Sequence, residues 1–193
     1  MPPVDPNNVM MTGENSFIRL SVNGGLTVRT RLSHWRVLWS PAGSGHSLFM
    51  LSELTGDDPR VYTDNEAVTR WLQESIETYL FPLFADVSLP VTSATFSRYG
   101  DPYTALHERI DADGETVVMT WSDCIEPFVL HMPPAVPPER PIGVFSTFIP
   151  ARTAEVELNG RKAAGTPIPE MRGDRQSSTA ALAWSETWVM PPA

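Results

Sequence analysis

Cysteine and basic side chains are scarce in this chain of 193 residues, and it has no long apolar run. The single cysteine, Cys124, cannot form an internal disulfide, and one thiolate cannot build a zinc site. Lysine and arginine together number 14 against 23 aspartates and glutamates, which gives a formal net charge of -9. Nucleic acids and anionic membranes both require a basic face, so we expect neither as a partner.

Targeting signals and cofactor motifs are also absent from the sequence. No apolar run approaches the roughly 20 residues of a transmembrane helix, and the N-terminus lacks the basic and apolar segments of a signal peptide. We therefore expect a cytoplasmic protein. No dinucleotide fingerprint or paired-histidine helix occurs, so we expect no cofactor and no metal. Because the four histidines lie on separate segments, a metal site assembled from distant parts of the chain is left open.

Most of the chain alternates between apolar and polar residues, which is typical of β-strands with one buried face. Turn sequences interrupt this alternation at Asn23-Gly24-Gly25, Asp113-Gly114 and Asn159-Gly160. Asparagine and glycine favour the tight turns of hairpins because these turns require positive φ. The spacing of strands and turns predicts about nine strands.

One segment, residues 64–81, has helical periodicity instead. Its apolar side chains recur every three or four residues and include Val68, Trp71, Ile76 and Tyr79, while the opposite face, which includes Glu77, is polar. A capping box at residues 63–66 predicts where the helix begins, and Pro82 predicts where it ends. We expect one amphipathic helix with a single buried stripe.

The chain length is that expected for one domain. We assign residues 13–193 to it and expect residues 1–12, which carry three prolines, to be disordered or an extended arm. The proline-rich residues 133–141 are interpreted as a loop within that domain, because the 52 residues beyond them make a marginal all-β domain. The polar residues 165–178 are interpreted as a mobile loop.

About nine strands and one helix fit two architectures. The first is a single antiparallel β-barrel, similar in general shape to calycin or lipocalin barrels, with the helix at one end or along the wall. The alternative is a curved sheet wrapped around the helix, as in hot-dog folds. The one-sided apolar stripe favours the barrel, since a helix enclosed by a sheet is apolar on more of its faces.

Two carboxylates fall on rows that should be buried, where an isolated charge is costly. Glu186 lies between tryptophans in the strand at residues 180–190, and Asp123 interrupts the apolar row of a long strand at residues 116–132. Burial would raise the pKa of either group and make it a proton donor or base. Alternatively, each pairs with a buried arginine. We expect a bend near Pro127 that exchanges the two faces of the long strand.

Two histidines are further candidates. His34 lies where the apolar parity of residues 26–39 changes, which predicts a bulge at Ser33-His34, and His131 lies near the end of the long strand. Either could polarise a ligand or relay a proton, and either could equally be a packing residue.

Together these residues predict a small-molecule site inside the barrel. We expect its acid–base groups to be Asp123, Glu186, His131 and His34. The expected ligand-binding residues are Trp35, Trp39, Met119, Trp121, Trp184 and Trp188. The predicted function is acid–base catalysis without a cofactor on a small apolar or aromatic metabolite, of isomerase, cyclase, hydratase or lyase type. A non-catalytic carrier or sensor, and a structural or assembly protein, are the alternatives. A homodimer is also compatible with the exposed apolar and proline-rich segments.

Overall fold

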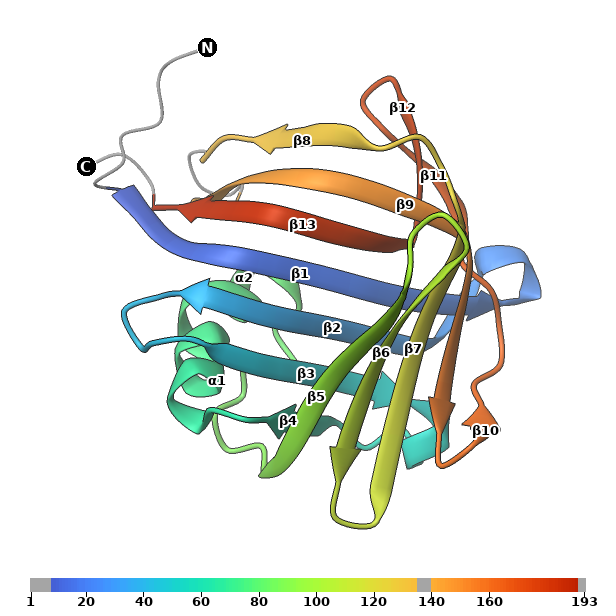
Figure 1. Cartoon of the computed structure of the whole chain (residues 1–193), viewed down its shortest axis with the longest axis horizontal. Coiled ribbons are helices and arrows are strands. Elements are labelled where there is room, and N and C mark those ends of the chain that lie inside the picture. The colour runs from blue at the N-terminus through green and yellow to red at the C-terminus, as the bar shows by residue number, and fades with distance from the viewer. Residues whose placement is uncertain (1–7, 135–139, 191–193) are drawn as a thin grey trace.

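The computed structural model describes residues 8–134 and 140–190, and within them nine strands close into a β-barrel with a helix against its wall (Figure 1). The prediction of a mainly β barrel with one helix is therefore confirmed. In order around the barrel the strands are β9 (Gly143–Leu158), β13 (Ala180–Val189), β1 (Val9–Val22), β2 (Thr27–Trp39), β3 (Gly45–Ser52), β4 (Arg60–Thr63), β5 (Val91–Asp101), β6 (Ala105–Ala112) and β7 (Glu115–Cys124). Pairing of β7 with β9 closes the ring.

Four shorter strands lie beside this ring. β8 (Phe128–Met132) pairs with the first half of β9, and β10 (Arg161–Lys162) pairs with its end. β11 (Pro169–Arg172) and β12 (Arg175–Ser178) form a separate hairpin, so residues 169–178 are a pair of strands and not the loop that we expected. β1 begins at Val9, which places residues 9–12 of the expected arm in the sheet, while residues 1–7 lie outside the described residues. Residues 135–139 of the proline-rich loop also lie outside them.

The three turn sequences lie where hairpins were predicted. They connect β1 to β2, β6 to β7 and β9 to β10. At the last two turns Gly114 and Gly160 have φ of +72° and +75°, values that side chains with a Cβ rarely adopt. Local turn chemistry therefore sets these connections.

The helix covers residues 66–80 and consists of α1 (Glu66–Leu72), a π-helical turn (Gln73–Glu77) and α2 (Thr78–Leu80). Its N-cap is Asn65, whose side chain accepts hydrogen bonds from the Ala67 and Val68 amides, so the capping box does not form as predicted. Glu66 instead pairs with Arg70. No helix in the described part of the chain has the length and apolar character needed to cross a membrane.

The helix also explains a departure from the all-antiparallel barrel that we predicted. It carries the chain from β4 to β5, and these two neighbours run parallel. Parallel strands need a crossover connection, which a helix usually supplies. The other neighbouring pairs of the ring are antiparallel.

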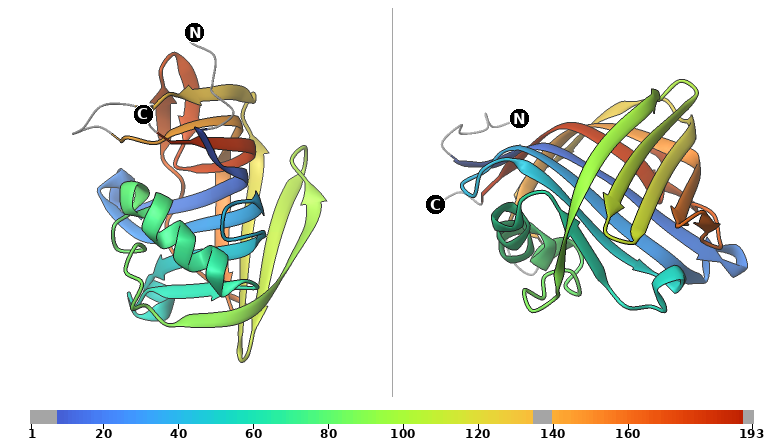
Figure 2. Two further views of the ribbon diagram at one scale, coloured as in Figure 1. Left: turned by 90° about the vertical axis from the view of Figure 1, so that its left-hand side faces the viewer. Right: turned by 60° about the horizontal axis from the view of Figure 1, so that its bottom comes forward.

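Apolar side chains form separate layers on the two faces of the barrel wall. The inner layer fills the barrel and draws on strands all around it, with Leu32, Leu48, Ile110, Met119 and Trp121 among its members. The outer layer joins β1–β4, β9 and β13 to the helix, with Trp35, Val37, Phe49, Leu72 and Ile76 among its members. Figure 2 shows the helix lying across β1–β4. Since these strands are covered on both faces, their alternation of apolar and polar residues is blurred.

This double covering corrects the bulge that we predicted in β2. Leu32 and His34 face the barrel interior, whereas Trp35 and Val37 face the helix. The pairing of β2 with β1 and β3 continues through Ser33 and His34 without a register shift. The apolar residues of β2 change from even to odd positions because both faces of the strand are buried, and not because the strand is irregular.

The predicted break in the long strand near Pro127 is confirmed. β7 and β8 pair with consecutive parts of β9, and the residue pairs shift register by one between Cys124–Ala151 and Phe128–Phe148. The expected exchange of the two faces is not seen beyond the break, because Met119, Trp121 and Leu130 lie on the faces that strict alternation gives them. Met119 and Trp121 in β7 point into the barrel, while Leu130 in β8 packs on its outer side with Phe148.

Candidate functional site

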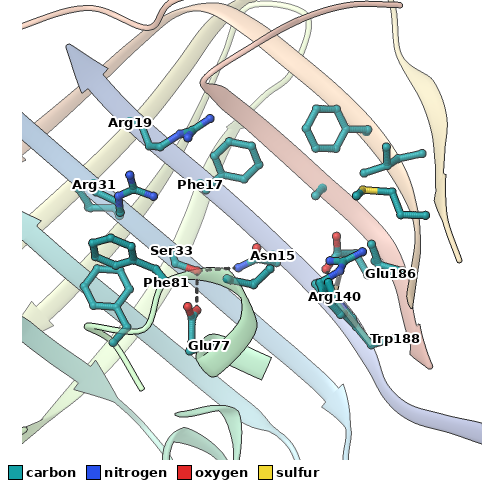
Figure 3. A pocket seen from close by; sticks show the side chains of 18 of the residues that line it. Asn15, Phe17, Arg19, Arg31, Ser33, Glu77, Phe81, Arg140, Glu186 and Trp188 are labelled. Atoms are coloured by element: carbon teal, nitrogen blue, oxygen red, sulfur yellow. Dashed lines mark hydrogen bonds between the residues drawn. The ribbon is translucent and has the colours of Figure 1, made fainter. Parts of the chain in front are cut away.

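A pocket of about 230 Å³ lies outside the barrel, between its wall and the end of the helix (Figure 3). Its wall residues Phe17, Phe148 and Ala183 alternate along their strands with Ile18, Ile149 and Leu182, which face the barrel interior. This pocket therefore lies on the opposite side of the wall from the internal site that we predicted. The lining comprises Asn15, Phe17, Arg19, Arg31, Leu32, Ser33, Glu77, Leu80, Phe81, Phe84, Leu130, Met132, Arg140, Val144, Phe148, Arg172, Ala183, Glu186 and Trp188.

Glu77 lies on the lining although its side chain comes from the supposedly polar face of the helix. It is only 1% exposed and accepts hydrogen bonds from Trp35 Nε1 at 2.7 Å and Ser33 Oγ at 2.9 Å. Asn15 in turn donates to Ser33 Oγ at 2.9 Å. Burial raises the pKa of the Glu77 carboxyl to about 7, against the opposing effect of the two hydrogen bonds.

The π-helical turn explains why the sequence placed Glu77 on the wrong face. Hydrogen bonds in a π turn span five residues instead of four, so the turn holds about one extra residue. Each residue of a helix is rotated by about 100° about the helix axis from the one before it. One extra residue therefore turns the later side chains away from the direction that a regular α-helix would give them. Tyr79, predicted to be buried, is 47% exposed. The buried residues instead follow a period of four: Val68, Thr69, Leu72, Gln73, Ile76 and Glu77.

Glu186 lies on the same lining and is 4% exposed. It accepts a hydrogen bond from Trp188 Nε1 at 2.8 Å. Burial raises the pKa of this carboxyl to about 8, and the hydrogen bond from Trp188 and the charge of Arg140 oppose the rise. At neutral pH the protonated form of Glu186 therefore predominates.

A bulge in β13 decides which way Glu186 points. Ser185 has φ of +52°, and the register between β13 and β9 shifts between Trp184 and Thr187. Trp184 belongs to the inner layer, whereas Glu186 and Trp188 lie on the pocket side. Strict alternation from the sequence had placed all three on one face.

Arginines and aromatic rings make up much of the remaining lining. Arg31 lies 4.1 Å from the centre of the Phe81 ring, and Arg140 lies 5.3 Å from that of Trp188. Arg172, from the hairpin of β11 and β12, lies 4.8 Å from the ring of Phe148. A guanidinium over a ring face is attracted by the ring quadrupole, so the two kinds of side chain stabilise each other.

Asp123 is not part of this site, and its predicted inward orientation is wrong. Its side chain is 59% exposed and pairs with Arg152 on the surface at 3.1 Å. Asp123 has φ of +51° at the point where β7 breaks from its regular course. This irregularity of the strand thus turns the carboxylate to solvent.

The two histidine candidates also lie away from the pocket. His34 faces the barrel interior, 3.9 Å from Glu108, and its ring stacks with those of Phe96 and His46. Burial, with help from the charge of His46, lowers the pKa of His34 to about 3, so its ring is neutral. His131 lies on the face of β8 opposite to Leu130 and stacks on Phe145. The structure does not bring either histidine together with Glu186.

The six predicted ligand-binding residues divide in a similar way. Trp188 lines the pocket, and Trp35 supports it through Glu77. Trp39 is 51% exposed at the end of β2. The others belong to the inner layer: Met119, Trp121 and Trp184.

A second cluster of charges, partly buried, lies on the inner side of the barrel wall. Arg98 bridges the carboxylates of Glu14 and Glu108, with His34 beside Glu108. Trp184 lies 5.4 Å from the Arg98 guanidinium. With one guanidinium shared between two carboxylates, these charges largely satisfy one another, as structural ion pairs do.

In the described residues, no three His, Cys, Asp or Glu side chains gather in a way that could hold a metal ion. Comparisons with protein-family models, with curated proteins and with solved structures find no match to this chain. Its function must therefore be argued from the pocket itself.

Proposed function

We propose that this chain is a cofactor-independent acid–base enzyme that binds a small apolar or aromatic metabolite in the pocket between barrel and helix. The observation that carries the proposal is the presence of two buried carboxyl groups, Glu77 and Glu186, on one apolar lining. Buried carboxyl groups are rare because the ionised form loses its hydration. Titratable groups perturbed by burial in a pocket are typical of sites that move protons.

The environments of the two groups favour different roles. Burial raises the pKa of Glu186 to about 8, so it is suited to donate a proton at neutral pH. Burial raises the pKa of Glu77 to about 7, so a large fraction of it is ionised and able to accept a proton. Two carboxyl groups whose pKa values are raised toward neutral pH by burial are suited to paired acid and base catalysis. Figure 3 shows them on either side of Asn15.

A ligand bound between the two groups would lose a proton from carbon to the Glu77 carboxylate. It would gain the proton of the Glu186 carboxyl at another carbon or at an oxygen. The ligand then keeps its composition and is isomerised, and proton exchange with water restores the starting states of both carboxyl groups. Hydration, elimination and cyclisation use the same pair, with water or an internal nucleophile as the second reactant.

The proposal is testable without knowledge of the substrate. An enzyme that removes a proton from carbon exchanges that proton for deuterium in D₂O, and ¹H NMR follows the loss of the signal. We expect the chain to catalyse this exchange in at least one member of a panel of small aromatic and aliphatic ketones and keto acids. Glu77→Gln should reduce the exchange rate by about 100-fold or more while ligand affinity stays the same.

A matched control is Glu155→Gln, which changes an exposed glutamate in the second half of β9 that pairs with Lys162. This variant should catalyse the exchange of the ligand's proton for deuterium at the same rate as the unmodified chain. Binding without exchange by the unmodified chain would contradict the catalytic proposal and favour a carrier or sensor. Absence of binding, with Glu77→Gln and Glu186→Gln altering stability alone, would favour a structural protein.

A further inference from the structure

We infer that the ligand of this pocket carries an anionic group, a carboxylate or a phosphate, which binds to Arg31 together with Arg19 and Arg172. The inference rests on the proposed function, since it names the chemical class of the ligand for the same pocket. It follows from the charges on the lining, from the geometry of the arginines and from the apolar surface beside them.

The charge balance of the pocket is opposite to that of the chain. Among residues 8–134 and 140–190, four arginines and two glutamates line it, whereas the chain has 23 acidic residues against 14 basic ones. Both glutamates have a raised pKa because of burial, which further reduces the negative charge available to balance the arginines. An acidic protein thus presents one concave site with an excess of positive charge, and such a site attracts anions.

Arg19 and Arg31 are placed in a way that stability alone does not favour. They are directly opposite each other on β1 and β2, and both line the pocket. Like charges directly opposite on neighbouring strands are destabilising. Burial and the charge of Arg19 both lower the pKa of Arg31, against the opposing charge of Glu77. A bound anion between the two guanidinium groups would remove this repulsion.

Charge compensation at this end of the pocket is incomplete. Glu170 pairs with Arg19 at 3.3 Å and with Arg172 at 2.9 Å. Arg31 has no carboxylate oxygen within 4.0 Å in residues 8–134 and 140–190. Within the same residues the buried Nε of Arg172 has no hydrogen-bond acceptor. A buried donor without a partner is costly. A ligand with negatively charged oxygens would therefore be stabilised by accepting hydrogen bonds from these arginines that the protein itself does not provide acceptors for.

The rest of the lining determines the size and apolar character of the remainder of the ligand. Phe17, Phe81 and Phe148 lie beside the arginines, and Leu130 and Met132 extend the apolar wall. Figure 3 shows Arg19 and Arg31 near Phe17, at the end away from Glu186. A volume of about 230 Å³ is smaller than the pockets of about 300–1,000 Å³ that hold drug-sized molecules. The ligand class is therefore a small aromatic or branched aliphatic anion, held by its charged end with its body toward the two glutamates.

Probes that share one body and differ in the head group test this inference. We would measure the binding of 2-naphthoate, 2-naphthyl phosphate, 2-naphthalenemethanol and 2-naphthylmethylamine by isothermal titration calorimetry, with a phenyl series in parallel. The two anions should bind about 10-fold or more tightly than the alcohol, and the amine should bind least. The tighter of the two anions distinguishes a carboxylate ligand from a phosphate ligand, because the two differ in charge and shape.

Substitution of Arg31 then locates the anion. Arg31→Met should weaken binding of the preferred anion by about 10- to 100-fold and leave binding of the alcohol unchanged. Arg31→Lys, which keeps the charge but loses the planar fork, should give an intermediate affinity and guards against a folding defect in the first variant. The matched control is Arg161→Met on β10, an exposed arginine outside the pocket, which should bind like the unmodified chain.

The outcomes separate the inference from the proposed function. Equal affinity of anion and alcohol, or an Arg31→Met variant that binds the anion normally, would overturn the anionic ligand and leave the pocket and its carboxyl groups as proposed. If no probe of either series binds to the unmodified chain, the proposed small-molecule function fails as well. Stronger binding of the amine would also overturn the inference, since it would assign the site to cations.

Discussion

The indole rings of Trp35 and Trp188 lie 5.5 Å apart, tilted by 55°, and each donates its N–H to a different buried carboxyl group. Trp35 holds Glu77 from the helix, and Trp188 holds Glu186 from its own strand. The two tryptophans thus connect the two candidate acid–base groups through direct ring contact. Because a buried indole N–H needs an acceptor and a buried carboxyl needs donors, each pair satisfies both partners.

The hydrogen bond from Trp35 should be measurable in the pKa of Glu77. Trp35→Phe keeps an aromatic ring but removes the donor, so the pKa of Glu77 should rise further, since the ionised form loses its shortest hydrogen bond. The free energy of unfolding should fall by about 1–3 kcal/mol. A ¹³C NMR titration of labelled glutamate carboxyls and urea unfolding provide the two readouts. Trp39→Phe, at an exposed position of the same strand, should change neither.

The two raised carboxyl pKa values predict how stability depends on pH. Burial raises the pKa of Glu77 to about 7 and that of Glu186 to about 8, both from an ordinary value of 4.5. Between about pH 4.5 and 8 the folded state therefore holds protons that the unfolded state has released. The contribution of these two groups to stability should be fully present below this window and fall as pH rises through it, by up to about 1.4 kcal/mol per pH unit for each group.

Urea unfolding at pH 5, 6, 7 and 8 measures this dependence. The double variant Glu77→Gln/Glu186→Gln, whose amides resemble the protonated carboxyls in shape, should lose the fall between about pH 6.5 and 8. It should keep a rise of stability from about pH 5 to 6.5, because burial lowers the pKa of His34 to about 3 and only the unfolded state binds that proton. Glu155→Gln should reproduce the slope of the unmodified chain, because its carboxylate is exposed. An equal slope in the double variant and the unmodified chain would mean that neither carboxyl titrates abnormally.

Gln73 fixes the segment that follows the helix. Its side-chain amide is fully buried and donates to the Phe84 and Asp86 carbonyls, each at 2.9 Å. Gln73→Leu leaves both carbonyls without this donor and should lower the free energy of unfolding by about 2–4 kcal/mol. Phe84 lines the pocket, so probe affinity should fall too. Glu74→Leu, at the exposed neighbouring position, should leave probe affinity unchanged.

The charges inside the barrel should matter for stability and not for the pocket. Arg98→Met leaves the Glu14 and Glu108 carboxylates facing each other without their shared guanidinium. Breaking such a pair typically lowers the free energy of unfolding by about 3 kcal/mol. Probe affinity at 20 °C should be unchanged, because these groups lie on the other side of the wall. Arg109→Met, exposed on β6, is the matched control for loss of one positive charge. A selective loss of probe binding in Arg98→Met would contradict the assignment of this cluster as structural.

Local sequence patterns predicted the elements of this fold well. Turn dipeptides located three hairpins, helical periodicity located the helix at residues 66–80, and Pro127 located the break between β7 and β8. Each of these features depends on residues close together in the chain, such as those that favour positive φ or lack an amide donor. Glu186 was also singled out correctly as a buried carboxyl, since two tryptophans flank it in sequence.

The composition of the site was predicted less well, and the reasons are specific. Glu77 was missed because the π turn changes the direction of the side chains that follow, and no sequence signal marked that turn. Asp123 was assigned inward because strict alternation was extended to a residue where the strand is irregular. Arg31 and Arg172 were missed because they come from distant segments, one of them expected to be a mobile loop.

By itself the sequence determined the strands, their turns and the helix, because these follow from backbone preferences and from the period of the apolar residues. Only the tertiary structure decided that the helix lies outside the barrel wall and that the pocket forms beneath it. An alternating strand shows which of its faces is buried, but it does not show what buries that face. The strands next to Glu77, and the strand that carries Glu186, are covered on both faces. Only the side chains packed against each face distinguish the barrel interior from the pocket.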